Sequence, residues 1–282
     1  MDIRNLKGSI VALVTPFSAD GSVDFDKLGE LMEYHIEHKT DAILTLGTTG
    51  ESSTMTHEED NEVCRFVVKK AGGRIPVLAG AGSNCTQTMI EKSLSYESIG
   101  ADGLLLITPY YNKANEEGIY RHFMETADRV HTPCILYNVP GRTGCSISPY
   151  NVSRLCRHEN IVGIKEASGD ISYAMSIAGF VSDSFALYSG NDDIAVPIMS
   201  IGGSGVISVS ANIIPEETHD MIYKYLEGDH NGALALQLKY YDLIKALFCE
   251  VNPVPIKEAM NLMGMNVGGY RLPLCEMSEA GK

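Results

Sequence analysis

The stretch NIVGIKEASGD, residues 160–170, has the pattern of a strand that is buried on both faces and ends in a turn. Its first part, Ile161 to Ile164, lacks the polar alternation of a half-exposed strand. Strands of this kind are typical of parallel sheets that helices cover on both sides. The stretch therefore predicts a parallel α/β fold, and it places Lys165 at the end of a buried strand.

Runs of the same character recur along the whole chain, at intervals of about 20 to 35 residues, the length of a strand plus a crossover helix. Helical patterns separate them, such as the capping box Thr56-His-Glu-Glu59. Strand and helix repeated eight times predict a closed (β/α)8 TIM barrel. The eight runs are SIVALVTPF (9–17), DAILTLG (41–47), IPVLAGAG (75–82), GLLLITPY (103–110), CILYNVP (134–140), IVGIKEAS (161–168), FALYSGND (185–192) and SGVISVSA (204–211).

A doubly wound open sheet is the alternative architecture. A dinucleotide-binding sheet of that kind needs the pattern G-x-G-x-x-G after its first strand, and Pro16-Phe17-Ser18 stands there instead. No change of composition divides the chain. We therefore expect one domain, with the (β/α)8 barrel over residues 1–212 and additional C-terminal helices as an extension over residues 213–282.

Composition excludes several classes of function. The 282 residues carry a formal net charge of −14, so no basic surface is available for nucleic acid. No apolar run reaches the roughly 18 residues that span a bilayer. The N-terminal apolar stretch is short and lacks an A-x-A-like cleavage site, so we expect no signal peptide. Seven cysteines without a C-x-x-C pair predict reduced thiols in a cytoplasmic protein. His35 and His38 lack a third ligand nearby, so we expect a solvated helix face there and no metal site.

The active site of a TIM barrel forms at the C-terminal ends of its strands, where Lys165 lies. One interpretation is a lysine whose ammonium reaches solvent or pairs with Glu166. The other is an amine shielded from water that attacks a carbonyl group and forms a Schiff base. Such an imine, once protonated, withdraws electrons and lets the adjacent carbon act as an enamine nucleophile.

Three neighbouring strand ends carry matching chemistry, although each has a plainer interpretation. The turn at residues 47–50, GTTG, is either a simple tight turn or a backbone nest for a carboxylate. Tyr137 is either a buried structural tyrosine or a proton shuttle beside an imine. Arg142 is either a surface charge or a fork that binds a second carboxylate.

Several motifs together resemble the 4-hydroxy-tetrahydrodipicolinate synthase (dihydrodipicolinate synthase) family of pyruvate-dependent class I aldolases. The likeness runs in order from about Gly8 to Met277. The motifs are GTTGE (47–51), TPYYN (108–112), YNVPGRTG (137–144), GIKEASGD (163–170), SGNDD (189–193) and GGSGVISV (202–209).

The resemblance implies an enzyme that condenses pyruvate with L-aspartate 4-semialdehyde to give 4-hydroxy-tetrahydrodipicolinate, in lysine and diaminopimelate biosynthesis. It implies no metal and no organic cofactor, because the imine itself is the electron sink. It makes Lys165 the Schiff-base lysine and Tyr137 the proton-transferring tyrosine. Thr48 is then the hydroxyl that links Tyr137 to Tyr111, and Tyr111 enters the site of a neighbouring subunit.

The same resemblance implies the substrate-binding residues and the assembly. Backbone groups around Thr48 and Thr49 match the site of the pyruvate carboxylate, and Arg142 matches the arginine that holds the carboxylate of the semialdehyde. Gly190 and Ile207 match pocket positions near the imine. The chain is expected to form a homo-oligomer, namely a dimer and, beyond it, the tetramer usual in the family.

Two other functions compete with this hypothesis. N-acetylneuraminate lyases and keto-deoxy sugar-acid aldolases keep the lysine, the tyrosine and a glycine-rich loop, but their pattern lacks the equivalent of Arg142. Arg142 and Tyr111 together favour the synthase. A keto-acid binding protein is the non-enzymatic alternative, but such a protein would not need a buried lysine next to a phenol.

Many family members are inhibited by lysine at a pocket near the dimer interface. Thr88 stands where the lysine-sensitive members have a glutamate that pairs with the amine of the effector, and Asp60 replaces a histidine and could compensate in part. Since a lost charged partner weakens binding strongly, we expect weak or absent inhibition by lysine. The positions that match this possible effector pocket are Ser52, Ser53, His57, Asn84, Thr88 and Tyr110.

Overall fold

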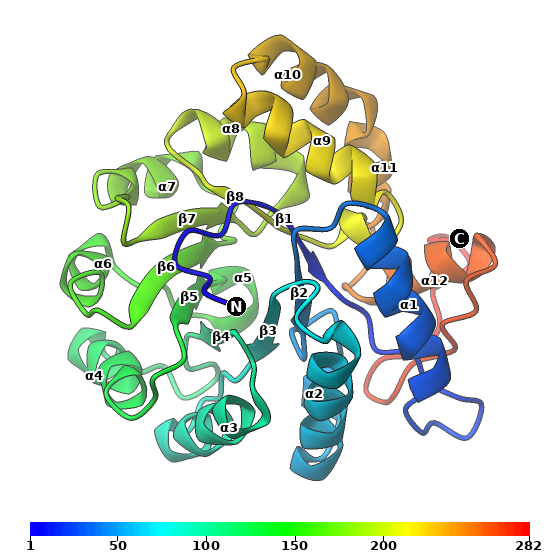
Figure 1. Cartoon of the computed structure of the whole chain (residues 1–282), viewed down its shortest axis with the longest axis horizontal. Helices are drawn as coiled ribbons and strands as arrows, with labels where there is room; N and C mark the ends of the chain where they lie inside the picture. The colour runs from blue at the N-terminus through cyan, green and yellow to red at the C-terminus, as the bar shows by residue number, and fades with distance from the viewer.

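The computed structural model describes residues 1–282 as a closed barrel of eight parallel strands with helices around it (Figure 1). The strands pair in sequence order, and the last strand pairs with the first, which confirms the predicted (β/α)8 barrel and excludes the open sheet. The strands are β1 (Gly8–Ala12), β2 (Ala42–Thr45), β3 (Val77–Gly80), β4 (Gly103–Ile107), β5 (Cys134–Asn138), β6 (Ile161–Glu166), β7 (Ala186–Ser189) and β8 (Gly205–Ser208).

Helices follow each strand and continue after the barrel closes. Local signals set their ends: in α2 the Thr56 side chain and Glu59 form the predicted capping box, and Gly72 ends the helix with a left-handed φ of 56°. None of the helices is both long and apolar enough to span a membrane. They are α1 (Phe25–Glu37), α2 (His57–Ala71), α3 (Thr86–Ile99), α4 (Glu116–Ala127), α5 (Pro140–Thr143), α6 (Pro149–Leu155), α7 (Ile171–Ala178), α8 (Ala195–Ser200), α9 (Pro215–Leu226), α10 (His230–Lys239), α11 (Tyr241–Ala246) and α12 (Val254–Leu262), with short 3-10 turns η1 (Ser52–Thr54), η2 (Asp192–Ile194) and η3 (Ser210–Asn212).

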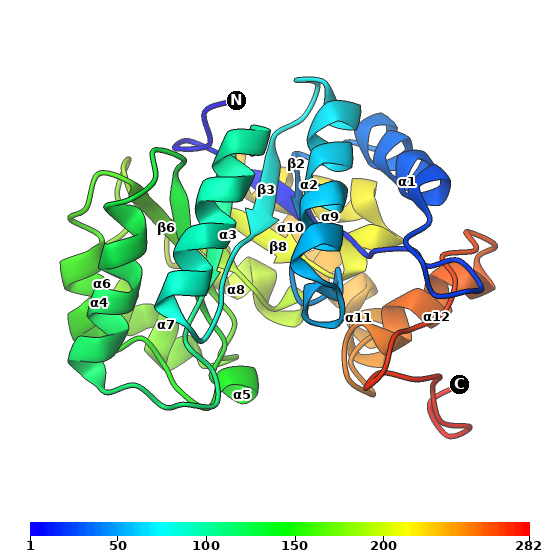
Figure 2. The ribbon, with the colours of Figure 1, turned by 90° about the horizontal axis from the view of Figure 1, so that it is seen from below.

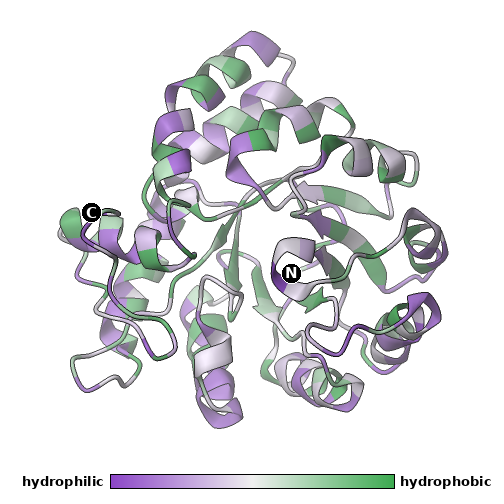
Figure 3. Ribbon diagram, turned by 180° about the vertical axis from the view of Figure 1, so that it is seen from behind, coloured by the Kyte–Doolittle hydropathy of each residue, from purple (hydrophilic) through white to green (hydrophobic).

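The apolar core has two layers, one inside the barrel and one between the barrel and its helices. Ile10, Leu44 and Ile135 belong to the inner layer and are fully buried or nearly so. The larger outer layer joins alternate strand residues, such as Ile43, to the inward faces of the helices. Hydrophobic residues accordingly concentrate on the strands, and hydrophilic residues face outward on the helices (Figure 3). Both faces of every strand are thus covered, as the uninterrupted apolar runs indicated.

One detail of the helical surface differs from the sequence-based expectation. His35 of α1 does not lie on a solvated face but is fully buried, with Nδ1 3.0 Å from the Thr40 hydroxyl. Burial lowers the pKa of His35 to about 3, so this histidine is neutral. The expectation was wrong because the turn at Thr40 folds back over the end of α1, and the helical pattern alone does not show that.

The last two helices, α11 and α12, lie toward the end of the barrel at which the strands finish, whereas α9 packs against the side of the barrel at β1 and β8. Figure 2 shows α11, α12 and the short helix α5 at one end of the barrel and the N-terminus at the other. The predicted boundary after residue 212 falls between β8 and α9. The last helices of the extension therefore lie at the end of the barrel that carries the loops after the strands, where TIM barrels place their active sites.

A fully buried ion pair fastens α12 to the loop after β2. Lys257 Nζ lies 2.8 Å from Glu51 Oε1, and neither side chain is exposed. The same ammonium donates to the backbone carbonyls of Thr15, at 3.1 Å, and of Gly269. Burial lowers the pKa of Lys257, and the Glu51 carboxylate acts against that shift. Each charge is thus supplied with partners, which a buried pair requires.

A second, more exposed anchor holds the chain that follows α12. The Arg271 guanidinium binds both carboxylate oxygens of Glu59, at 2.9 and 2.6 Å. Its Nε also donates to the Gly21 carbonyl at 2.8 Å. The hydrogen bonds from Arg271 lower the pKa of Glu59 to about 2. The C-terminal segment is thereby tied to α2 and to the loop before α1.

Replacing Lys257 by alanine tests how firmly the extension is attached. The substitution leaves the Glu51 carboxylate buried and unpaired, which costs about 3–5 kcal/mol in the free energy of unfolding. Urea unfolding followed by far-UV circular dichroism measures the loss. Lys224→Ala is the control, because Lys224 pairs with Asp229 at the surface and its loss should change stability by no more than about 0.5 kcal/mol. Equal stability losses in the two variants would contradict this account.

Candidate active site

A cavity of about 190 Å³ opens at the C-terminal ends of the strands. Its walls combine polar groups from the loops with apolar side chains from the strands. The sequence-predicted residues that line it are Thr48, Thr49, Tyr137, Arg142, Lys165 and Gly190. The apolar side chains around them include Ala12, Leu44, Leu105, Val139 and Val209.

Lys165 projects from β6 into this cavity and is 6% exposed. It is the register partner of Tyr137 on β5, and its Nζ lies 4.4 Å from the centre of the Tyr137 ring. The adjacent carboxylate does not pair with it, because Glu166 accepts from Asn138 Nδ2 at 2.7 Å and from the backbone N–H of Ser168 at 2.6 Å. The amine therefore meets an aromatic face and the cavity in place of a carboxylate.

Gly190 provides the room that the lysine needs. A Cβ atom at this position would lie 3.0 Å from Lys165 Cε and 2.5 Å from the Cβ of Ala167. Contacts that short are repulsive, so any larger residue after β7 would displace the lysine. The glycine is thus required by the close approach of two neighbouring strand ends.

The GTTG turn forms a fixed wall of the cavity. Gly50 N–H donates to Gly47 O, and Glu51 N–H donates to Thr48 O, both at 3.1 Å. Glu51 has a left-handed φ of 55° and is held by the buried ion pair with α12. The strained backbone and its anchor keep the two threonines of the turn against the cavity. Tight turns of this kind direct backbone N–H groups outward, toward an anion.

Arg142 and Tyr111 lie at the rim rather than in the interior. Arg142, on α5, is exposed at the mouth, and its Nη2 donates to the backbone carbonyl of Asn252 at 3.1 Å. Tyr111 does not line the cavity of its own chain; its side chain is 90% exposed, and its φ is 73°. A bulky residue in the left-handed region is strained, and such strain is concentrated at functional positions.

The cavity differs from the sequence-based picture in one predicted residue and in several added ones. Ile207 on β8 is fully buried inside the barrel and does not line the cavity, whereas Val209, two residues further on, does. The extension adds Phe248 and Asn252, which the strand-end analysis did not find. No local signal points to them, because they come from a region after the eighth strand.

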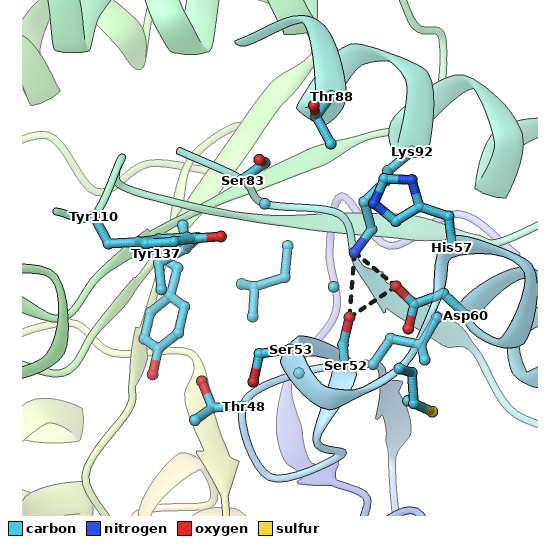
Figure 4. Close-up of a pocket in the computed structure, with 17 residues that line it drawn as sticks. Thr48, Ser52, Ser53, His57, Asp60, Ser83, Thr88, Lys92, Tyr110 and Tyr137 are labelled. Atoms are coloured by element: carbon cyan, nitrogen blue, oxygen red, sulfur yellow. Dashed lines mark hydrogen bonds and ion pairs between the residues drawn. The ribbon is translucent and has the colours of Figure 1, made fainter. Parts of the chain in front are cut away.

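A second cavity of about 310 Å³ adjoins the first and shares Gly47, Thr48, Leu105 and Tyr137 with it (Figure 4). Most of the predicted effector positions line this second cavity. Asn84 does not; its backbone carbonyl accepts from Asn112 Nδ2 at 2.9 Å. The predicted positions that do line it are Ser52, Ser53, His57, Thr88 and Tyr110.

An internal lysine already occupies the polar end of the second cavity. Lys92 Nζ lies 2.9 Å from Asp60 Oδ2 and 3.2 Å from the Ser52 hydroxyl, which itself donates to Asp60 at 3.0 Å (Figure 4). Asp60 is 1% exposed, and burial raises its pKa while the Lys92 ammonium acts in the opposite direction. The carboxylate that the sequence offered for an external amine thus has a partner from α3.

Metal-binding residues are not assembled in this chain. No three histidine, cysteine, aspartate or glutamate side chains come together in a way that could hold a metal ion. All seven cysteines are free thiols. The reactive groups that line the cavity are an amine, a phenol, hydroxyls and a guanidinium.

Comparisons with known proteins agree over almost the whole chain. The model of the dihydrodipicolinate synthetase family matches residues 5–282. A 4-hydroxy-tetrahydrodipicolinate synthase of Thermoanaerobacter sp. (strain X514) is 56% identical over 274 residues, which are 97% of this chain and 92% of that relative. The solved structure of the chloride-inhibited dihydrodipicolinate synthase from Acinetobacter baumannii, complexed with pyruvate, has a TM-score of 0.95 and 43% identity, covering 98% of this chain and 95% of the other.

A further solved structure is that of dihydrodipicolinate synthase from Cyanidioschyzon merolae with lysine bound. It has a TM-score of 0.95 and 40% identity, and it covers 98% of this chain and 94% of the other. These matches extend over the barrel, the cavity and the C-terminal helices alike. The chain therefore belongs to the dihydrodipicolinate synthetase family and is an enzyme of its class I aldolase-like, 4-hydroxy-tetrahydrodipicolinate synthase type.

Proposed function

We propose that this chain condenses pyruvate with L-aspartate 4-semialdehyde in the cavity around Lys165, to give 4-hydroxy-tetrahydrodipicolinate. The observation that carries the proposal is the position of the amine. Lys165 is only 6% exposed, and the carboxylate of Glu166 is bonded to Asn138 instead of to the amine. The amine faces a cavity large enough for a small keto acid. An amine shielded from water without a counter-ion is suited to attack a carbonyl carbon.

The first half of the reaction joins pyruvate to the protein. Lys165 Nζ attacks the keto carbon, the carbinolamine loses water, and a protonated imine remains. Each of these steps moves a proton, and Tyr137 lies against the amine with its hydroxyl turned toward the region of Thr48 (Figure 4). We assign the proton transfers to Tyr137, with Thr48 as the hydroxyl that continues the relay.

The second half uses the imine as an electron sink. Loss of a proton from the methyl carbon gives an enamine, and its carbon attacks the aldehyde of the second substrate. The amine of that substrate then attacks the imine carbon, closes the ring and displaces Lys165. Because the imine accepts the electrons, the sequence of steps requires no metal or organic cofactor.

Two anion sites orient the substrates. The backbone N–H groups at Thr48 and Thr49 suit the pyruvate carboxylate, which must lie close to the imine. The Arg142 guanidinium at the mouth suits the carboxylate of the semialdehyde, because a planar guanidinium can donate two parallel hydrogen bonds to one carboxylate. The relative from Acinetobacter baumannii was solved in complex with pyruvate, which supports pyruvate as the first substrate.

Assembly completes the proposed site. The Tyr111 side chain is 90% exposed, so it packs little against its own chain, and its backbone is held in the left-handed region. We assign Tyr111 to the site of a neighbouring copy, where it extends the relay from Tyr137 through Thr48. A homodimer is the smallest assembly that allows this exchange, a tetramer is the larger one, and the reaction takes place in the cytoplasm.

The choice of aldehyde tests the proposed function directly. Incubation with pyruvate should consume aspartate 4-semialdehyde and leave N-acetylmannosamine, the acceptor of the lyase alternative, unchanged. Lys165→Ala should lower turnover by at least about a thousandfold, because no imine can form. Lys245→Ala, which removes an exposed lysine of α11, is the matched control and should keep full activity. Consumption of N-acetylmannosamine in preference, or turnover by Lys165→Ala, would refute the proposal.

The neighbouring cavity bears on regulation by lysine. An external lysine would need a carboxylate for its second ammonium, and Thr88 supplies none. Asp60 is already paired with Lys92 through Oδ2, so its negative charge is largely compensated inside the protein. The structure of this cavity supports weak or absent inhibition by lysine.

A lysine titration of the steady-state rate tests this. The wild-type chain should show no half-inhibition in the micromolar range. Lys92→Gln, which leaves Asp60 without its internal ammonium, should bind external lysine more tightly than the wild type. Micromolar inhibition of the wild type, or an unchanged response in Lys92→Gln, would show that the internal ion pair does not govern the pocket.

A further inference from the structure

Asn252 joins the two proposed carboxylate sites of the cavity. Its side-chain Nδ2 donates to the Thr49 hydroxyl at 3.0 Å, and its backbone carbonyl accepts from Arg142 Nη2 at 3.1 Å. The residue lines the cavity and is 5% exposed. One residue of the extension therefore touches both the turn that suits the pyruvate carboxylate and the guanidinium that suits the second substrate.

The amide of Asn252 is only half used within the protein. Its Oδ1 is buried and has no hydrogen-bond partner. Rotating the amide by 180° would let Oδ1 accept from the Thr49 hydroxyl but would leave Nδ2 without a partner, so one end of the amide stays unpaired in either orientation. A buried acceptor without a donor is unfavourable in the free protein and calls for a specific explanation. In the wall of an active-site cavity, the simplest donor is a group of the substrate.

The chemistry of the second substrate provides such a donor. In aspartate 4-semialdehyde the ammonium and the carboxylate are attached to the same carbon. When Arg142 binds the α-carboxylate of the substrate, the α-ammonium therefore lies close to the residue that contacts the guanidinium. Asn252 is that residue, since Arg142 donates to its backbone carbonyl.

We propose that Asn252 is the specificity residue that recognises the amine of the aldehyde substrate, with Oδ1 accepting from the α-ammonium while Arg142 holds the α-carboxylate. The inference rests on the proposed function and deepens it, because it explains how an amino-acid aldehyde is selected over an aldehyde acid without the amine. Asn191 also lines the cavity with an unpartnered Oδ1, but it is more exposed, and the Arg142 guanidinium donates to Asn252 and not to Asn191.

Paired substrates isolate the amine. Succinate semialdehyde has the same carbon chain and carboxylate as aspartate 4-semialdehyde but lacks the amine. The experiment measures kcat/KM for aspartate 4-semialdehyde and the competitive inhibition constant of succinate semialdehyde, both at saturating pyruvate. Asn252→Ala should lower the first by about 10- to 100-fold, as the loss of a hydrogen bond to a charged group does, and change the second by less than about threefold.

Matched variants separate recognition from positioning. Thr49→Val removes the contact that Asn252 makes with the turn, so it should affect both aldehydes alike. Asn252→Asp keeps an acceptor and adds a negative charge, so it should raise the preference for the aminated aldehyde even if Asn252→Ala does not fold. Equal losses for both aldehydes in Asn252→Ala, or loss of discrimination in Asn191→Ala instead, would overturn the assignment.

A trapping control separates this inference from the proposed function. Sodium borohydride with pyruvate should attach a reduced adduct to the wild type and to both Asn252 variants. Trapping in all of them with unchanged discrimination would overturn only the role of Asn252. No trapping in the wild type would overturn the proposed function itself.

Discussion

The chemistry of the site depends on one amine, that of Lys165, which is removed from water without a counter-ion. A buried ammonium is costly unless it is paired, and proteins usually supply a carboxylate. Here the nearest carboxylate, on Glu166, is turned away and held by Asn138 and a backbone N–H. Lys165 is left with the face of Tyr137 and with empty volume. That arrangement is poor for stability and well suited to covalent chemistry with a small keto acid.

The C-terminal extension is part of the site rather than an accessory to the barrel. Its buried pair between Lys257 and Glu51 fixes the far end of the turn that carries the two threonines. Asn252, just before α12, then contacts that turn and Arg142. Strand ends supply the reactive groups, and Asn252 of the extension links the two carboxylate sites that we propose. Loss of the extension would therefore disturb recognition as well as stability.

Much of the fold could be predicted because its signals are local. Eight apolar runs contain the eight strands, and the C-terminal ends of those runs located several residues that line the cavity, including Lys165 and Gly190. The rest depends on contacts between distant segments. Asn252 reaches the site from beyond the eighth strand. Ile207 was expected near the imine but is buried deeper inside the barrel, and Val209, two residues further along the chain, lines the cavity.

The second cavity shows the same limit in a different form. The sequence identified its positions and the missing glutamate at Thr88, and most of those residues do meet there. It did not show that Lys92, from the next helix, pairs with Asp60 and fills the polar end. Nothing in the spacing of two charged residues on separate helices reveals whether they face one another. The residues of this pocket could thus be predicted from the resemblance, whereas its internal ion pair could not.

The account is tested most directly by locating the covalent adduct. The protein is incubated with pyruvate, reduced with sodium borohydride, digested and analysed by mass spectrometry of its peptides. A reduced three-carbon adduct on Lys165, and on no other lysine, is the predicted result. Modification of a different lysine, such as Lys92 or Lys257, or no modification at all, would contradict the central claim.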